Sequence, residues 1–456
     1  MTWAILCEEA ELAVECSTRA KELGLDVDCR VSESPTREAI DTIRRGHDAA
    51  VVLVAPPPLE TLVEIAEAAG AVAGTPRIAA AFLAQGDDPV AAISIARDLG
   101  IVAVEEVRPL VSALAVLESG VERPWAVALG SLPSADRQRF ARIAGLRQSG
   151  GGILSRGDDG GVVLQSAKGS RRHPLGDGRD AAEAIVAIHA AAGATGTPRP
   201  VYEAVDPARA AGILFGPPRA LSGHASKAAL GAYGVPTPAE ELCASASRAA
   251  AEASRMGFPV RITLASPDLR LLEHPDLIVD GLDHATQVRD VFRQLVATAE
   301  ARVAGARILG VTVSAATVPR ATLRARLTPL THGRVLVDIG FADPHGLASG
   351  DHTQTVFPTS VARFERVLGR LAGADLLVDG PAAVRRQTID AIAQAVLRSS
   401  AFVADHADAI TAVELDPLVV LADGSAEVRD ACIEVSDAFE RRLDREAGTG
   451  ASTANG

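Results

Sequence analysis

The run Ala49-Ala-Val-Val-Leu-Val-Ala55, followed at once by Pro56-Pro-Pro58, has the pattern of a strand that is buried on both faces. Such apolar strands are typical of parallel sheets covered by helices on both sides. We predict a strand over residues 49–54 and four more at the apolar runs 3–7, 27–31, 77–82 and 101–104. Stretches with helical periodicity separate them, at residues 11–23, 36–45, 59–69, 89–99 and 107–117. This alternation predicts a doubly wound parallel α/β sheet, which places ligands at the carboxyl ends of its strands.

The overall composition narrows the function classes. The chain has 456 residues, 45 Lys+Arg against 58 Asp+Glu, and a formal net charge of −13. Only three of those cations are lysines, Lys21, Lys168 and Lys227. An acidic balance argues against sequence-independent nucleic-acid binding, and 3% aromatic residues argue against a single-strand stacking platform. The length and the 48% of apolar residues suit two or three domains with cores of their own.

Cysteine usage and hydropathy indicate the cellular compartment of the protein. The five cysteines form no CxxC pair and no metal-finger spacing, which indicates reduced, buried thiols. No apolar run approaches the roughly 20 residues that span a bilayer. The first residues lack the basic flank and long apolar stretch of a signal peptide. We therefore expect a cytoplasmic protein with no membrane and no nucleic-acid partner.

Residues 124–205 form a connecting region whose fold the sequence leaves open. A strand at 125–129, an apolar segment at 162–164, and helices at 135–144 and 181–192 are expected there, with a linker at 193–200. The Gly-rich run at 150–152 suggests a phosphate loop, but no Gly-Lys-Ser/Thr follows it and no GxGxxG is present. A hairpin is the favoured interpretation.

The pattern changes from residue 206 onward. A helix is predicted over 221–233, opened by Ser222 as N-cap and closed by Gly234. Further helices are predicted at 247–256, 285–304, 361–371 and 381–403. Strands are predicted at 241–244, 259–264, 307–313, 323–327, 334–339, 409–415, 418–421 and 426–431. The polar tail 441–456 is expected to be disordered.

Three stretches carry a resemblance to a known family. They are Leu221-Ser-Gly-His-Ala-Ser-Lys-Ala-Ala-Leu-Gly-Ala-Tyr-Gly-Val-Pro-Thr-Pro238, Gly257-Phe-Pro-Val-Arg-Ile-Thr-Leu-Ala-Ser-Pro-Asp-Leu-Arg270 and Val413-Glu-Leu-Asp-Pro-Leu-Val-Val-Leu421. They resemble the ATP-grasp module of NDP-forming acyl-CoA synthetases, the ADP-forming acetate–CoA ligases related to succinyl-CoA synthetase. Residues 1–125, with Ala55-Pro-Pro-Pro-Leu59, resemble the flavodoxin-like ligase-CoA domain that precedes the ATP-grasp module in fused members.

The resemblance implies a domain order. A flavodoxin-like parallel α/β domain at residues 1–123 and the connecting region 124–205 precede an ATP-grasp (α+β) domain at 206–440, and the tail 441–456 follows. It also implies Mg²⁺ and ATP or ADP as ligands. In this family the phosphate passes through a phosphohistidine on a CoA-binding half. No Gly-rich first turn of such a half follows the first strand here, so CoA is expected to come with a partner domain.

The nucleotide-binding positions implied by the resemblance depart from the family pattern. Thr263 stands where the family has a lysine, and the Gly-Gly turn is missing from the segment after Arg270. Arg261 and Arg270 could replace the lost charge, because guanidinium groups bind phosphate in a different geometry. The alternative is that they are solvated arginines. The sequence assigns no catalytic residue.

The metal-binding positions implied by the resemblance are acidic. Glu414, Asp416 and Asp430 occupy the places of the family's magnesium ligands. Side chains two apart on a strand share a face, so Glu414 and Asp416 can reach one hard cation. Whether Asp430 lies beside Asp416 or beside Pro417 depends on a register that the sequence does not fix. The alternative is three exposed carboxylates on a terminal hairpin.

Three functional hypotheses follow, and the third is a plain scaffold with no small ligand. The first is an ATP-grasp subunit of an ADP-forming acyl-CoA synthetase that is catalytically impaired alone and acts with a CoA-binding partner subunit or as a homo-oligomer. The second is a non-catalytic homologue that binds nucleotide or CoA and serves regulation or assembly. The kept acidic residues favour nucleotide binding, whereas the lost lysine and Gly-Gly turn argue against catalysis.

Overall fold

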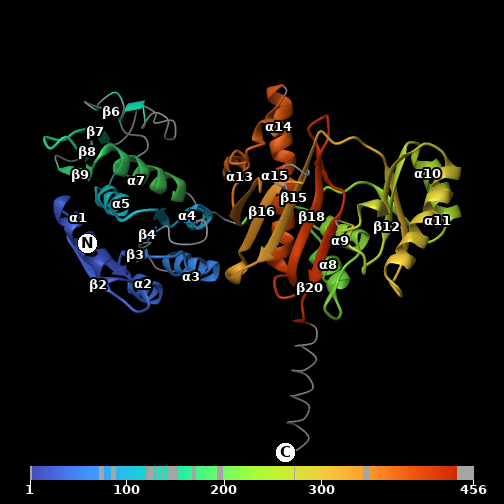
Figure 1. Cartoon of the computed structure of the whole chain (residues 1–456), viewed down its shortest axis with the longest axis horizontal. Helices are drawn as coiled ribbons and strands as arrows, with labels where there is room; N and C mark the ends of the chain where they lie inside the picture. The colour runs from blue at the N-terminus through green and yellow to red at the C-terminus, as the bar shows by residue number, and fades with distance from the viewer. Residues whose placement is uncertain are drawn as a thin grey trace, which may run out of the picture. The chain divides into compact units, whose positions relative to one another are not determined.

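The computed structural model divides into two compact units, Met1–Pro198 and Arg199–Gly456 (Figure 1). It describes residues 3–70, 77–83, 89–119, 121, 128–129, 132, 134, 137–138, 140, 152–166, 171–192, 199–271, 273–342, 350–379 and 381–438. Each unit has its own hydrophobic core. Among the described helices, none combines the length and apolarity needed to cross a bilayer.

The first unit is built on the predicted parallel sheet, in the order β2-β1-β3-β4-β5. Its strands are β1 (Trp3–Cys7), β2 (Val27–Val31), β3 (Ala49–Leu53), β4 (Ile78–Phe82) and β5 (Val102–Val104). Its helices are α1 (Ala10–Glu22), α2 (Pro35–Arg44), α3 (Leu59–Gly70), α4 (Pro89–Asp98) and α5 (Val107–Glu118). All five expected strands and all five expected helices are present. The strand order is that of flavodoxin-like folds.

Residues after 121 add a second, smaller sheet to this unit. Strands β6 (Ala128–Leu129), β7 (Gly152–Arg156), β8 (Val162–Ser166) and β9 (Arg172–Gly176) form it, and α7 (Gly178–Ala191) follows. Leu154, Leu164 and Leu175 are fully buried in the same core as the parallel sheet. Strands β7 and β8 form a hairpin whose turn lies at residues 157–161, rather than at the Gly-rich run 150–152 where a hairpin is expected and where Gly152 begins β7. The start of the 125–129 strand, most of the 135–144 helix, residues 150–151 and most of the linker lie outside the described residues.

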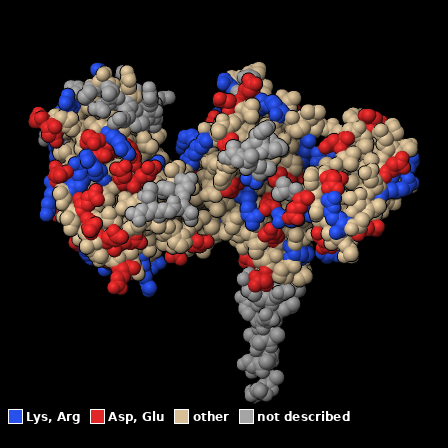
Figure 2. Space-filling view, in the orientation of Figure 1, with Lys and Arg blue, Asp and Glu red and all other residues tan. Residues whose placement is uncertain are grey.

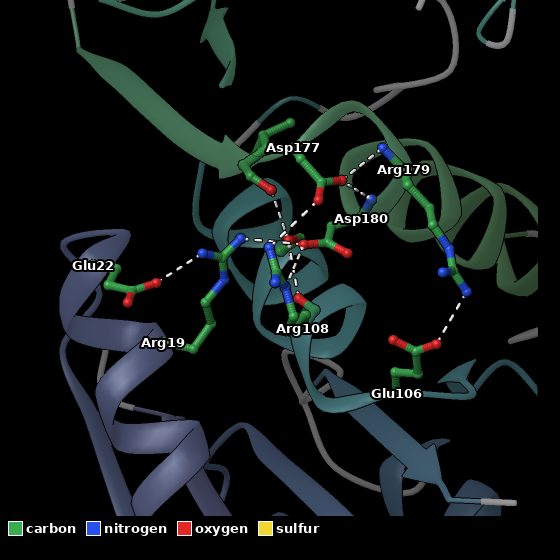
Figure 3. A network of polar contacts seen from close by, with 9 residues as sticks. Arg19, Glu22, Glu106, Arg108, Asp177, Arg179 and Asp180 are labelled. Atoms are coloured by element: carbon green, nitrogen blue, oxygen red, sulfur yellow. Dashed lines mark hydrogen bonds and ion pairs between the residues drawn. The ribbon is translucent and has the colours of Figure 1, made fainter. Parts of the chain in front are cut away.

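A buried carboxylate ties this addition to the parallel sheet's helices (Figure 3). Asp177 caps α7 by accepting from the backbone N–H groups of Arg179 and Asp180, at 2.8 and 2.9 Å. Asp180, on the first turn, then accepts from Arg19 of α1 at 3.2 Å and from Arg108 of α5 at 3.0 Å. One side chain therefore joins three helices.

The second unit contains two antiparallel sheets. The larger has the order β10-β20-β18-β15-β16-β17, with β19 paired to β18; the smaller has the order β11-β14-β12-β13. The larger sheet comprises β10 (Arg219–Ala220), β15 (Ala321–Pro329), β16 (Val335–Phe341), β17 (His352–Phe357), β18 (Ile410–Val420), β19 (Ala426–Val428) and β20 (Ala431–Val435). The smaller comprises β11 (Glu240–Cys243), β12 (Val260–Ala265), β13 (Ile278–Leu282) and β14 (Gly310–Ala315).

Helices cover one face of each sheet in the second unit. The long α15 (Ala382–Asp405) packs against β15, β16, β18 and β19, and its neighbours are α13 (Val361–Leu368) and α14 (Ala374–Val378) (Figure 1). Helices α10 (Ala246–Met256) and α11 (Ala285–Arg302) pack on the smaller sheet, and α8 (Pro207–Leu214) and α9 (Gly223–Gly231) pack together beside β20. The Ser222 hydroxyl caps α9 as predicted, accepting from the Ala225 N–H.

The C-terminal strands differ from the sequence prediction. The two strands predicted on either side of Asp416 are one strand, β18, and the predicted last strand 426–431 is divided into β19 and β20 around Arg429 and Asp430. Strands β13 and β17 were not predicted. Both are edge strands in which apolar residues are adjacent, as in Ile278-Val279 and Val356-Phe357, so they lack the alternation that marks a half-buried strand. The tail from residue 439 lies outside the described residues.

Candidate functional site

The larger sheet of the second unit has one apolar and one charged face. Leu323, Ala325 and Leu327 of β15 alternate toward the core under α15, so Arg324 and Arg326 point to the opposite face. The same alternation along β18 puts Glu414 and Asp416 on that face. Because helices already cover the apolar side, the charged side is the one left for a ligand.

Strand register turns these side chains into a row across the sheet. Arg326 lies opposite Glu414 on one side and opposite Asp338 of β16 on the other, and Gln354 of β17 lies opposite Asp338. Arg326 donates to Glu414, and the Gln354 amide donates to Asp338 at 2.7 Å. His352 Nδ1 lies 3.1 Å from Asp338. These side chains form a polar network that spans four strands.

Arg324 is the cation of this face that is not used by the network. It lines a cavity with Arg326, Asp338, His352, Glu414 and Asp416. Within the described part of the chain it makes no hydrogen bond or ion pair, although its charge acts on Asp416. It is therefore free to bind an anion on this face.

A second cavity brings four of the sequence-predicted residues together. Arg270, Glu414, Asp416 and Asp430 line it, with Gly223 at the start of α9. Arg270 follows β12 of the smaller sheet, whereas Glu414 and Asp416 belong to β18 and Asp430 directly precedes β20. The cavity thus lies between the two sheets, and side chains from both sheets line it.

The register of the terminal strands places Asp430 beside Asp416. Glu414 pairs with Cys432 and Leu415 with Ala431, and the Asp416 N–H donates to the Asp430 carbonyl at 3.1 Å. Pro417 faces Arg429 instead, whose N–H donates to the Pro417 carbonyl at 2.9 Å. Of the two registers left open by the sequence, the structure therefore has the one that pairs the two aspartates.

Burial shifts the pKa of both aspartates in the same direction. It raises the pKa of Asp416 to about 6, an effect that Arg324 opposes and Glu414 adds to. It also raises the pKa of Asp430 to about 6, opposed by Lys227 and the Ala431 N–H. Burial removes the water that would solvate the ionised carboxylates, and the nearby cations replace it only in part. Both positions would therefore be stabilised by an added cation.

Glu414, unlike the two aspartates, already has its charge neutralised, because two guanidinium groups bind it. Arg270 donates to one of its oxygens and Arg326 to the other. Arg270 also lies 3.9 Å from Glu434 of β20. Among the described residues, no three His, Cys, Asp or Glu side chains are grouped as a metal site. Hard carboxylate oxygens suit Mg²⁺, so the chemistry of Asp416 and Asp430 fits the ion, whereas Glu414 is available to it only after releasing an arginine.

The other two predicted nucleotide-binding residues lie on β12 and do not line this cavity. Arg261 is paired with Asp280 of β13 at 2.9 Å. Thr263 lies opposite Thr312 of β14. Both are half-buried on one face of the smaller sheet. Arg261 acts on Asp430 through its charge, and of the three only Arg270 contacts one of the carboxylates, Glu414.

Two groups of polar residues were not predicted from the sequence. One is the row of charged side chains across the larger sheet, and the other is a group around Lys227. Alternation of Arg324 and Arg326 within an apolar strand is the signal that could have shown the row, because it marks a polar face. The buried group consists of Lys227 and Glu240, which form an ion pair, and His224, whose Nδ1 lies 3.0 Å from Glu240. Lys227 also donates to the Arg429 carbonyl at 2.9 Å, so it is fully used inside the fold.

Comparison with solved structures finds similar folds at low identity. The PH1788 protein of Pyrococcus horikoshii is 22% identical, with 51% of this chain and 99% of that protein covered and a TM-score of 0.46. The dinucleotide forming acetyl-coenzyme A synthetase 1 of Candidatus Korarchaeum cryptofilum, solved with coenzyme A, is 23% identical, with coverages of 48% and 94% and a TM-score of 0.42. An ATP citrate lyase of Methanosaeta concilii is 10% identical, with coverages of 49% and 52% and a TM-score of 0.30.

Sequence comparison is more specific. A search of curated proteins found no match. Residues 216–435, however, match the ATP-grasp domain family. These residues contain both antiparallel sheets, the charged face and the cavity between the sheets. The part of this chain from residue 216 to residue 435 is therefore an ATP-grasp domain.

Proposed function

We propose that this chain is the ATP-grasp component of an ADP-forming acyl-CoA synthetase and that it binds Mg²⁺ with ATP or ADP in the cavity between its two antiparallel sheets. The observation that carries the nucleotide part is the meeting of Asp416, Asp430 and Arg270 in one cavity, beside the free Arg324. The acyl-CoA part rests on the resemblance of residues 221–238, 257–270 and 413–421 to that family.

Each group has a role in this proposal. Asp416 and Asp430 would hold Mg²⁺, whose contribution is to neutralise phosphate charge. Arg324 would bind phosphate oxygens directly, because a guanidinium group donates two parallel hydrogen bonds to an anion. Bringing a polyanion into a partly buried cavity is costly unless its charge is met. Arginines would therefore supply what lysines commonly supply, since the domain contains one lysine, Lys227, and Glu240 neutralises it.

Calorimetric titration of the full chain with Mg²⁺·ATP tests nucleotide binding. We expect weak but measurable binding that Asp416→Asn reduces by about tenfold or more, since one carboxylate ligand is lost. Asp423→Asn is the matched control, because Asp423 is an exposed turn residue next to the same strand. Absence of binding in the unchanged protein would contradict the proposal, and so would equal affinities for the two variants.

Turnover separates the two candidate functions. We expect the pure chain to form no acyl-CoA from acetate, CoA and ATP, because CoA and the phosphohistidine would come from a CoA-binding partner. Acyl-CoA formation after such a partner is added supports the synthetase. The alternative, a non-catalytic homologue that binds nucleotide or CoA, is favoured by one observation: Glu414 is already neutralised by two arginines. Nucleotide binding without turnover in the reconstituted mixture would support that alternative.

A further inference from the structure

We propose that Arg270 is an exchangeable latch that occupies Glu414 in the empty protein, moves to the phosphates when nucleotide binds, and thereby couples nucleotide binding to metal binding. The inference rests on the proposed nucleotide site and adds a regulatory device to it. Its starting point is a contact between the two sheets of the ATP-grasp domain. Arg270 follows β12 of the smaller sheet, whereas its partners Glu414 and Glu434 belong to β18 and β20 of the larger sheet.

The contact has the geometry of a clamp across the cavity. One terminal nitrogen of Arg270 donates to Glu414, and the other lies 3.9 Å from Glu434. Arg270 also lines the cavity that holds Asp416 and Asp430. A guanidinium group in this position lines the cavity and supplies the positive charge that a metal ion would bring to Glu414. Bound metal and the clamp therefore compete for the same carboxylate.

The clamp is built so that it can open. The Arg270 side chain is 35% exposed and Glu414 is 20% exposed, so breaking their contact does not strand a fully buried charge. Arg326, on the same sheet as Glu414, stays in place on the other carboxylate oxygen. A partly exposed ion pair contributes little to stability, so a polyphosphate with several charge-assisted hydrogen bonds can compete with it for Arg270.

An exchange of partners follows from these contacts. A phosphate that approaches the cavity offers Arg270 a stronger acceptor than Glu414. Once Arg270 has moved, Glu414 is left with one guanidinium and joins Asp416 and Asp430 as an oxygen donor for a cation. Nucleotide then strengthens metal binding, and by linkage metal strengthens nucleotide binding by the same factor.

Arg270→Gln tests both roles of Arg270, as competitor of the metal at Glu414 and as donor to phosphate. Loss of the first role raises metal affinity, whereas loss of the second lowers nucleotide affinity. Affinity for Mn²⁺ alone, measured on the full chain by the electron paramagnetic resonance of the free ion, is expected to rise at least about fivefold, the lower end of typical coupling between sites. Affinity for ATP in the presence of EDTA is expected to fall by a similar factor, because a phosphate donor is lost. A general loss of structure cannot raise one affinity while lowering the other.

Arg307→Gln is the matched control. Arg307 also pairs with an acid of the smaller sheet's loops, Asp268, at 2.7 Å, but it does not line the cavity. We expect it to leave both affinities unchanged. Arg270→Lys provides a second variant if Arg270→Gln does not fold. One ammonium group cannot span Glu414 and Glu434, so Mn²⁺ affinity is expected to rise, but by less.

The outcomes distinguish this inference from the proposed function. Unchanged or weaker Mn²⁺ binding by folded Arg270→Gln overturns the latch, and if ATP still binds, the nucleotide site stands. Stronger Mn²⁺ binding by Arg270→Gln, with no ATP binding by any variant, supports Arg270 as the competitor of the metal but overturns both the exchange with nucleotide and the proposed nucleotide site.

Discussion

At the scale of single residues, Gly223 shows how closely the ATP-grasp domain is packed around Asp430. It is the first residue of α9, directly after the Ser222 N-cap. A β-carbon added there would lie 2.0 Å from Oδ1 of Asp430. The absence of a side chain at this position therefore allows the carboxylate to lie against the beginning of the helix.

Gly223→Ala is expected to be less stable than Gly231→Ala by about 1–3 kcal/mol, the usual cost of overpacking. Gly231 ends the same helix and has nothing within 4 Å of an added β-carbon, so it is the matched control. Urea denaturation of both variants measures the difference. Asp430 must also move in Gly223→Ala, so Mg²⁺·ATP affinity should fall in that variant only. Equal stabilities would show that Asp430 rotates away at no cost.

A second residue-scale prediction concerns His406, which is buried beside Tyr233. The Tyr233 hydroxyl donates to Asp405 at 2.8 Å and lies 3.3 Å from Nε2 of His406. Burial lowers the pKa of His406, and the nearby Asp405 and Asp408 only partly oppose this. The unfolded chain therefore binds the proton more tightly, and stability is lost as pH falls from the unfolded pKa, about 6.5, toward the lower folded pKa.

His406→Gln should flatten this dependence, even if lost packing lowers the stability at every pH. The measurement is the free energy of unfolding between pH 7 and pH 5, where each unit of pKa difference corresponds to about 1.4 kcal/mol. His47→Gln, at an exposed position of the first unit, is the control and should keep the slope of the unchanged protein. A slope that His406→Gln leaves intact would assign the acid sensitivity to other groups.

At the scale of secondary-structure elements, Asp180 joins α1, α5 and α7 of the first unit through Arg19 and Arg108 (Figure 3). Its side chain is 5% exposed, whereas Glu22, the other partner of Arg19, is 56% exposed. The two acids form ion pairs with the same arginine in very different surroundings. Burial decides how much each pair contributes, because desolvated groups that lose a partner are left uncompensated.

Asp180→Asn is expected to destabilise the first unit by about 1–3 kcal/mol, because two arginines lose a charged acceptor. Glu22→Gln should change stability by less than about 0.5 kcal/mol, as surface ion pairs usually do. Differential scanning calorimetry of the full chain measures both changes. Since the second unit has a separate core, its transition should not move in either variant. Equal effects of the two substitutions would contradict the assigned role of Asp180.

Element prediction succeeded where the pattern is local. The five strands of the parallel sheet and the five helices α1–α5 follow from periodicity, because a parallel sheet buried on both faces gives continuous apolar runs. The same reasoning failed at β13 and β17, edge strands in which apolar and polar residues do not alternate. It also divided β18 at Pro417, although the strand continues through that residue.

At the scale of the whole molecule, the chain comprises a flavodoxin-like unit and an ATP-grasp domain, each with its own core. On the face shown in Figure 2, acidic and basic side chains are interspersed over the part that is not drawn in grey. The net charge of −13 is therefore not gathered there into one large acidic field. Local pairs such as Arg326 with Glu414 dominate instead, and the charges of the candidate site are set by its immediate neighbours.

The sequence by itself determined the order of the domains, most of their elements and the acidic residues of the candidate site. These follow from periodicity, capping and motif spacing, which depend on residues close together in the chain. Only the tertiary structure decided that Asp430 lies beside Asp416, that Arg324 and Arg326 share their face, and that Arg270 reaches Glu414 across 144 residues of sequence. Strand register and the approach of two sheets fix these contacts, and neither is written in any local pattern. The scarcity of lysine leaves arginine as the main cation of the candidate site, and the fold places Arg270 and Arg326 on Glu414.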